Sequence, residues 1–151
     1  MISVIKMGNE KLITYCGMYC GDCYGYQGKI ASLAGKLNEE LNNANFKKNA
    51  NHFANLPFFK EFKNYDSFVK LLKTLEGLTC EGCRDGGGPP FCEIRKCCGE
   101  KEIMGCWECG EFKSCEKLNF LSATHGDAHI KNLGLIKEEG MEKFVDGDRH
   151  W

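Results

Sequence analysis

Apolar residues in the first half of the chain recur every three or four positions. The first such series is Tyr26, Ile30, Leu33, Leu37, Leu41 and Ala44. Because an α-helix has about 3.6 residues per turn, this spacing predicts an amphipathic helix from about residue 22 or 24 to the mid-forties. Gly35 weakens this helix slightly, and the Asn-rich segment 42–55 is expected to loosen or re-aim it.

A second helix is predicted after a run of aromatic residues. Pro57 suits a first helical position, and a bulky patch follows it: Phe58, Phe59, Phe62 and Tyr65. Asp66 or Ser67 is placed to cap a helix that Gly77 ends. The apolar residues of this helix are Phe68, Leu71, Leu72 and Leu75. Since their spacing is amphipathic, we interpret the aromatic residues as packing between two helices rather than as a ligand pocket.

Shorter elements are predicted at the two ends of the chain. Lys11–Tyr15 is a β-like run, and Cys115 opens a short helix. Asp127 is placed to cap a helix that Gly140 ends, and a last apolar turn follows it. Residues 146–151 are expected to fray unless Trp151 packs on the body of the protein.

Residues 80–115 are irregular by composition. Gly86-Gly87-Gly88-Pro89-Pro90 excludes an interior helix or a central strand, and no Gly-Lys-Ser/Thr follows to make a phosphate loop. A loop of this length inside a compact domain must be held by something. The predicted fold is therefore a small, mainly α domain, residues 1–151, with a long irregular segment stapled by metal. Its parts are 1–79 with the N-terminal cysteines and two helices, 80–117 with the remaining cysteines, and 118–151 with C-terminal helices.

The chain has 11 cysteines in 151 residues. Ten are predicted metal ligands: Cys16, Cys20, Cys23, Cys80, Cys83, Cys92, Cys97, Cys106, Cys109 and Cys115. They include three C-x2-C knuckles, tight turns in which two sulfurs face one ion and nearby glycine lets the backbone fold back. Cys98 adjoins Cys97 and cannot easily reach the same ion, so it is the candidate unligated thiol. The repeated knuckles predict tetrahedral thiolate sites.

Zinc, in two ions, is the predicted metal, and an iron–sulfur cluster is the less favoured cofactor, because the ferredoxin run C-x2-C-x2-C-x3-C-P is absent.

Two ligand schemes stay open. In the sequential scheme one site is Cys80, Cys83, Cys92 and Cys97, and the other is Cys106, Cys109 and Cys115 with one N-terminal cysteine. In the crossed scheme Cys80 and Cys83 pair with Cys106 and Cys109, and the N-terminal three join Cys92, Cys97 or Cys115. Both schemes pin the Cys-rich segment to the N-terminal helix.

The expected cellular compartment and the net charge of the chain reduce the number of possible functions. The first residues show no export leader, and no apolar run approaches the ~20 residues of a membrane span, so a reducing cytoplasm is expected. There, dense and odd-numbered cysteine favours metal over disulfides. The net charge is −1, and residues 80–117 hold six basic against eight acidic residues. Nucleic-acid binding is disfavoured because it requires the opposite sign.

Two enzyme motifs are incomplete. Cys16-x3-Cys20-x2-Cys23 has the spacing of radical S-adenosylmethionine enzymes, but Asp22 stands where they place an aromatic residue, and the chain is too short for their barrel. His52, His125, His129 and His150 lack hydrolytic zinc spacing, although His125 or His129 stays open as a fourth zinc ligand. No catalytic residue is assigned.

The ordered motifs resemble a known group. They are Tyr15-Cys-Gly-Met-Tyr-Cys-Gly-Asp-Cys23, Cys80-Glu-Gly-Cys83, Cys92-Glu-Ile-Arg-Lys-Cys97, Cys106-Trp-Glu-Cys109 and Cys115-Glu-Lys-Leu118. Over residues 15 to about 145 the chain resembles the bacterial and archaeal family called domain of unknown function 3795. The resemblance implies a zinc-binding protein and brings no known activity. It also implies a small residue at position 98, which agrees with an unligated Cys98.

The leading hypothesis is thus a cytoplasmic binding or regulatory module with structural four-thiolate zinc sites. Its rival is a thiol- or iron–sulfur-based redox protein or enzyme, and a third reading is a scaffold without chemistry. The partner, whether protein or small molecule, and the oligomeric state are not specified by these patterns.

Overall fold

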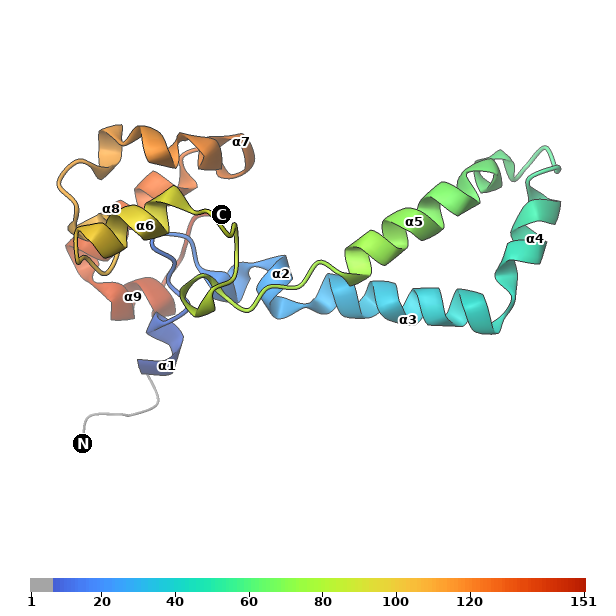
Figure 1. The fold of residues 1–151 in the computed structure, drawn as a ribbon, viewed down its shortest axis with the longest axis horizontal. Helices are drawn as coiled ribbons and strands as arrows, with labels where there is room; N and C mark the ends of the chain where they lie inside the picture. Colours follow the sequence, from blue (N-terminus) through green and yellow to red (C-terminus); the bar gives the residue numbers. More distant parts are fainter. Residues whose placement is uncertain (1–6) are drawn as a thin grey trace. The chain divides into compact units, whose positions relative to one another are not determined.

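The computed structural model describes residues 7–151, and it is mainly helical over that range, as predicted (Figure 1). The expectation that no export leader is present rests on residues 1–11, of which residues 1–6 lie outside the described residues. Two compact units divide the chain: Met1–Asp22 with Glu81–Trp151 form unit 1, and Cys23–Cys80 form unit 2. No helix in the described range is both long and apolar enough to cross a bilayer.

Unit 2 is built from consecutive helices. They are α2 (Tyr24–Gln27), α3 (Lys29–Asn43), α4 (Phe46–Phe53), the 3-10 helix η2 (Lys60–Asn64) and α5 (Tyr65–Glu76). The single helix predicted from residue 22 or 24 is divided at Gly28, whose φ of 65° lies in the left-handed region. Asn45, with φ 50°, lies between α3 and α4 and changes the direction of the chain from one helix to the next. Both residues tolerate this backbone better than most, which is why the breaks fall there.

The aromatic run packs its rings together inside unit 2. Centroid distances of 5.4–6.4 Å link the rings of Phe46, Phe53, Phe59, Phe62 and Tyr65. Pro57, expected at a helix start, lies in a turn before η2. The expected caps were also wrong: α5 begins after Asn64 rather than after Asp66 or Ser67, whereas its end at Gly77 is confirmed.

Unit 1 consists of short helices joined by irregular segments. The helices are α1 (Met7–Glu10), α6 (Glu93–Glu100), α7 (Ser122–His125), α8 (Ala128–Glu139) and α9 (Met141–Asp146). The 3-10 turns are η1 (Cys20–Asp22), η3 (Cys83–Asp85), η4 (Cys106–Glu108), η5 (Phe112–Ser114) and η6 (Glu116–Leu121). The helix ends predicted at Asp127 and Gly140 are confirmed. The β-like run at 11–15 forms one isolated bridge, between Ile13 and Tyr19, because the chain turns back at once.

The segment 80–115 contains α6, which its loop-like composition did not predict. The helix follows the Gly-Pro run directly, and its Ile94 and Cys98 side chains are buried. They join a core made of the buried side chains Ile13, Tyr19, Ile94, Cys98, Trp107, Phe112, Leu118, Leu133, Ile136 and Phe144. Burial of one face against this core stabilises a helix too short to persist alone.

The C-terminal tail is docked on unit 1 rather than frayed. Arg149 forms a two-bond ion pair with Asp22, at 2.7 and 3.0 Å, and its guanidinium lies 4.3 Å from the centre of the Tyr19 ring. His150 and Asn132 exchange hydrogen bonds of 2.8 and 2.9 Å. These contacts tie the tail to both the N-terminal segment and α8.

Candidate metal centre

Unit 1 contains an open pocket of about 360 Å³ whose wall carries five cysteines. They are Cys97, Cys98, Cys106, Cys109 and Cys115, and we call this the five-cysteine pocket. Helix α6 supplies the first two, the knuckle at η4 supplies the next two, and the residue before η6 supplies the last. One knuckle and two single cysteines from separate elements are typical of a four-thiolate zinc site.

Two lysines bring positive charge to these sulfurs. Lys101 Nζ lies 3.5 Å from Cys109 Sγ, and this contact raises the pKa of the lysine. A hydrogen bond to Cys97 likewise raises the pKa of Lys117. Both lysines also line the pocket, so two positive charges lie beside its sulfurs.

Cys98 faces a sulfur within the same pocket. Its Sγ lies 3.9 Å from Cys106 Sγ, and only 1% of the residue is exposed. The hydrogen bond with Cys106 lowers the pKa of Cys98, while the same bond, together with burial, raises the pKa of Cys106. The contact therefore shifts the pKa values of the two thiols in opposite directions.

Three further cysteines of unit 1, Cys16, Cys83 and Cys92, influence one another electrostatically. Burial, followed by negative charge on Cys83 and Cys92, raises the pKa of Cys16 to about 11. Burial also raises the pKa of Cys83. The Cys83 N–H donates to Cys20 Sγ at 3.4 Å, the backbone-to-sulfur contact that a knuckle uses.

Cys23 and Cys80 belong to unit 2 and lie on either side of Gly25. The Cys80 N–H donates to Gly25 O at 3.0 Å. A Cβ at Gly25 would stand 3.3 Å from Cys80 Cβ and 3.7 Å from Cys23 Sγ. A Cβ at position 25 would therefore crowd Cys80 and make an ordinary van der Waals contact with Cys23.

Two arginines position the cysteine segments, and neither was identified from the sequence. Arg84 donates from Nε to Ile13 O at 2.8 Å and from Nη2 to Met104 O at 2.7 Å. Its guanidinium also lies 4.3 Å from the centre of the Tyr15 ring. The only sequence signal was its place directly after Cys83, at the end of a knuckle.

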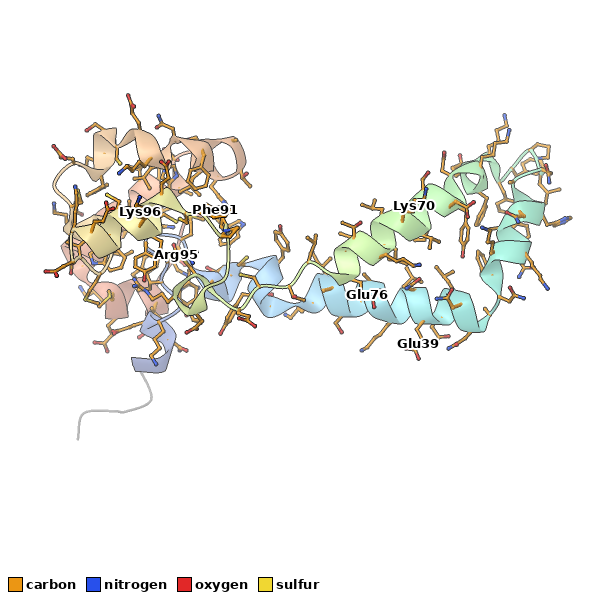
Figure 2. The ribbon with its side chains drawn as sticks, viewed as in Figure 1. Glu39, Lys70, Glu76, Phe91, Arg95 and Lys96 are labelled. Carbon is orange, nitrogen blue, oxygen red and sulfur yellow. The ribbon has the colours of Figure 1, made fainter. Side chains whose placement is uncertain are left out.

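Arg95, on α6, holds the glycine-proline loop. Its Nη2 donates to Gly87 O at 2.7 Å and to Pro89 O at 3.4 Å; Figure 2 labels its side chain. The loop is thereby fixed against the helix that carries Cys97 and Cys98. This contact could not be predicted from the sequence, because no local pattern indicates that an arginine binds the backbone six to eight residues before it.

The five-cysteine pocket groups cysteines that neither scheme drawn from the sequence puts together. Cys97 lies with Cys106, Cys109 and Cys115, whereas the schemes give the fourth ligand to an N-terminal cysteine or split the set. Within the described residues, no three His, Cys, Asp or Glu side chains converge as a formed ion site. The ligand assignments therefore stay predictions.

The N-terminal segment is nevertheless joined to the Cys-rich segment within unit 1. Cys106 N–H donates to Tyr15 O at 2.8 Å, in addition to the Cys20–Cys83 and Ile13–Arg84 hydrogen bonds. These bonds connect the same two segments that the predicted shared metal ions would connect.

The histidine pair lies where α7 ends and α8 begins. Burial and the nearby His125 lower the pKa of His129, while Asp127 opposes this effect. The Nδ1 atoms of both histidines are buried and have no hydrogen-bond partner among the described residues. No cysteine figures among the charged neighbours that shift the pKa of His129.

The cysteine motifs and their order match a known family. Residues 12–120 match the family described as proteins of unknown function, DUF3795. The chain belongs to this family. The DUF3795 match spans all the cysteines from Cys16 to Cys115 and ends before α7, short of the extent to about residue 145 that the resemblance suggested. No curated protein and no solved structure matches the chain.

Proposed function

We propose that this protein is a zinc-binding module in which thiolate sites stabilise the irregular segments of unit 1. The five-cysteine pocket is the observation that carries the proposal. Cys97, Cys106, Cys109 and Cys115 supply the four soft donors that zinc prefers. Zinc bound there would hold α6, η4 and η6 together, so part of its binding energy would be folding energy.

The charges around the pocket support this ligand set. Four thiolates around one Zn²⁺ carry a net charge of about −2. Lys101 and Lys117 each approach one of these sulfurs and offset that charge. A site that keeps all four protein ligands has no open position, so the proposed role of the metal is structural.

Metal analysis of protein purified without air tests the proposal. We expect about two zinc ions per chain, as the number of cysteine ligands allows for four-thiolate sites. Cys109→Ser should lose about one of them, because it removes a ligand from the five-cysteine pocket. Cys98→Ser, the matched control in the same pocket, should keep both if Cys98 is the unligated thiol. Wild-type protein with less than about one zinc per chain would contradict the proposal.

An iron–sulfur cluster is the second candidate, because the five-cysteine pocket offers one cysteine more than the four that such a cluster requires. The hydrogen bond from Lys101 Nζ to Cys109 Sγ, at 3.5 Å, is of the kind that tunes the potential of such a cluster. Stoichiometric iron and sulfide with visible thiolate-to-iron absorbance in air-free protein would select this candidate.

The proposed setting is the reducing cytoplasm, where thiolates stay available for metal. We propose a binding or regulatory role, with a protein or small-molecule partner and without nucleic acid. Negative charge added by thiolate sites opposes binding to phosphate backbones.

A further inference from the structure

The five-cysteine pocket contains one sulfur more than a four-thiolate zinc site uses. If Cys97, Cys106, Cys109 and Cys115 hold the metal, as proposed above, Cys98 is left over. Cys98 lies on α6, is 1% exposed and belongs to the core of unit 1. Buried cysteine packs as a small apolar residue, so another small apolar residue could fill the position and packing alone does not require a thiol there.

The spare thiol touches one of the four proposed ligands. Cys98 Sγ lies 3.9 Å from Cys106 Sγ, and either sulfur can be the donor of the hydrogen bond between them. A disulfide bond is about 2.05 Å long, so the two sulfurs must approach by about 2 Å to form one. Rotation about the Cα–Cβ bond moves a cysteine sulfur over such a distance and does not require the backbone to move.

Hydrogen bonds hold the backbone at both cysteines. The C=O of Cys98 accepts a hydrogen bond of 3.0 Å from the N–H of Ile103, which follows α6. The N–H of Cys106 donates to Tyr15 O at 2.8 Å. The chain itself therefore keeps the two sulfurs within reach of each other.

The pocket gives a small oxidant access to this pair of sulfurs. Both cysteines line its open volume of about 360 Å³, which is large enough for a small hydroperoxide. Cys106 is half-buried, whereas Cys98 is almost fully buried, so the oxidant meets Cys106 first. A cysteine that binds metal does so as the thiolate, which is also the form that attacks a peroxide. Cys106 is therefore placed to be oxidised, and Cys98 is placed to react with the product.

We propose that a hydroperoxide oxidises Cys98 and Cys106 to a reversible disulfide, and that this disulfide releases the metal of the five-cysteine pocket. The release rests on the proposed function, because it requires Cys106 to be a zinc ligand, whereas the disulfide itself does not. A disulfide sulfur carries no thiolate charge, so the site keeps only three of its four ligands. Helix α6, η4 and η6 then lose the ion that joins them.

Two sulfurs are oxidised and one hydroperoxide is reduced in this reaction. The Cys106 thiolate attacks the terminal peroxide oxygen: an S–O bond forms, the O–O bond breaks, and an alcohol, or water from hydrogen peroxide, leaves with a proton from solvent. The Cys98 sulfur then attacks the sulfenic sulfur of Cys106: the S–S bond forms, the S–O bond breaks, and water leaves with the Cys98 proton. A dithiol reductant reverses the oxidation by exchange and returns two electrons and two protons.

Peptide mapping of the full chain, loaded with zinc and treated with hydrogen peroxide, tests the disulfide. After acid quenching, unfolding and alkylation, trypsin cuts between the two cysteines at Lys101, so a disulfide from Cys98 to Cys106 joins peptide 97–101 to peptide 102–113. A disulfide within the knuckle, between Cys106 and Cys109, leaves these peptides separate. Fragmentation of the joined peptides distinguishes Cys98 from Cys97. We expect the joined peptides to appear on oxidation and to disappear with dithiothreitol.

A chromogenic chelator measures zinc release from the same samples. We expect about one zinc per chain to be released as the disulfide forms. Cys98→Ala and Cys98→Ser should hold their zinc before oxidation and release it at least about tenfold more slowly under peroxide, because the second thiol of the disulfide is absent. Met104→Leu is the matched control, since Met104 is an oxidisable residue, 50% exposed, between the two cysteines in the chain. It should release zinc at the wild-type rate.

Three results would overturn the inference. The first is oxidised protein without a bond between Cys98 and Cys106, and the second is zinc release from both Cys98 variants at the wild-type rate. The third is loss of zinc from both variants before oxidation with unchanged circular dichroism. Cys98 would then be a ligand itself, because two sulfurs on one tetrahedral zinc ion also lie about 3.8 Å apart. Wild type that holds no zinc but forms the disulfide would contradict the proposed function and support the disulfide.

Discussion

Single side chains join the segments of unit 1 that lie far apart in the sequence. Arg84 contacts the backbone at Ile13 and at Met104 and covers the Tyr15 ring, so one guanidinium connects three stretches. A lysine cannot reproduce this, because its single ammonium lacks the planar fork of donors that reaches two carbonyls at once. The cysteines could be identified from the sequence by their number and spacing, whereas Arg84 could not, because its partners are set by tertiary contacts.

His129 gives a pH dependence with a defined sign. Burial and His125 lower its pKa in the folded protein below the ordinary value of 6.5. The unfolded chain therefore takes up a proton at His129 more readily than the folded chain, and stability is lost as the pH falls below about 6.5. We expect His129→Leu to lose less stability than wild type between pH 7.5 and 5.5, which appears as a smaller fall in Tm.

The control for this prediction is His52→Gln, because His52 is exposed on α4. Thermal unfolding at the two pH values, each with the same zinc concentration, should show the wild-type pH dependence in this variant. If His129→Leu and wild type lost the same amount of stability between pH 7.5 and 5.5, other groups, such as metal ligands taking up protons, would account for the whole loss.

Backbone breaks decide the lengths of the elements, and Gly28 is the clearest case. Its φ of 65° ends α2 and begins α3, and no atom lies within 4 Å of the place a Cβ would take. Gly28→Ala should therefore destabilise the protein by about 1 kcal/mol through backbone strain alone, and Gly28→Asn by less. The measurement is the free energy of unfolding in urea.

Gly99 provides the opposite expectation in the same experiment. It lies within α6, and a Cβ there would also meet nothing within 4 Å. Gly99→Ala should stabilise the protein by about 0.5–1 kcal/mol, because alanine loses less backbone entropy in a helix. If both substitutions changed stability in the same direction, left-handed strain at Gly28 would not be the cause.

Periodicity predicted the elements of the chain better than composition did. The helix from Asp127 to Gly140 and the end of α5 at Gly77 were found because apolar spacing and terminal residues agreed. Helix α6 was missed because glycine, proline and cysteine around it suggested only loop, while burial of Ile94 and Cys98 decides its formation. Cys97 lies in the same pocket as Cys106 and Cys109 because α6 places it there, so this grouping could not be predicted while α6 was missed.

At the scale of the whole molecule, the two units should respond differently to metal removal if zinc stabilises unit 1. Chelation should increase amide hydrogen exchange in residues 92–117 strongly, because irregular segments there would lose their ligands. The helices α3 and α5 should change less, since their amides are protected by helical hydrogen bonds. Mass spectrometry of exchanged peptides measures both, and unchanged exchange over 92–117 after verified metal loss would contradict the prediction.

The hydrogen bond from Cys80 to Gly25 O also has an evolutionary consequence. The chain enters unit 2 near Gly25 and leaves it at Cys80, and the N···O distance between these two residues is 3.0 Å. The residues between them therefore form a loop whose two ends are hydrogen-bonded to each other. Insertions or deletions farther along that loop leave the tie intact and do not alter the residues on either side of it. Natural selection is thus free to lengthen, shorten or substitute the helices of unit 2 for new contacts while the cysteine arrangement stays constant.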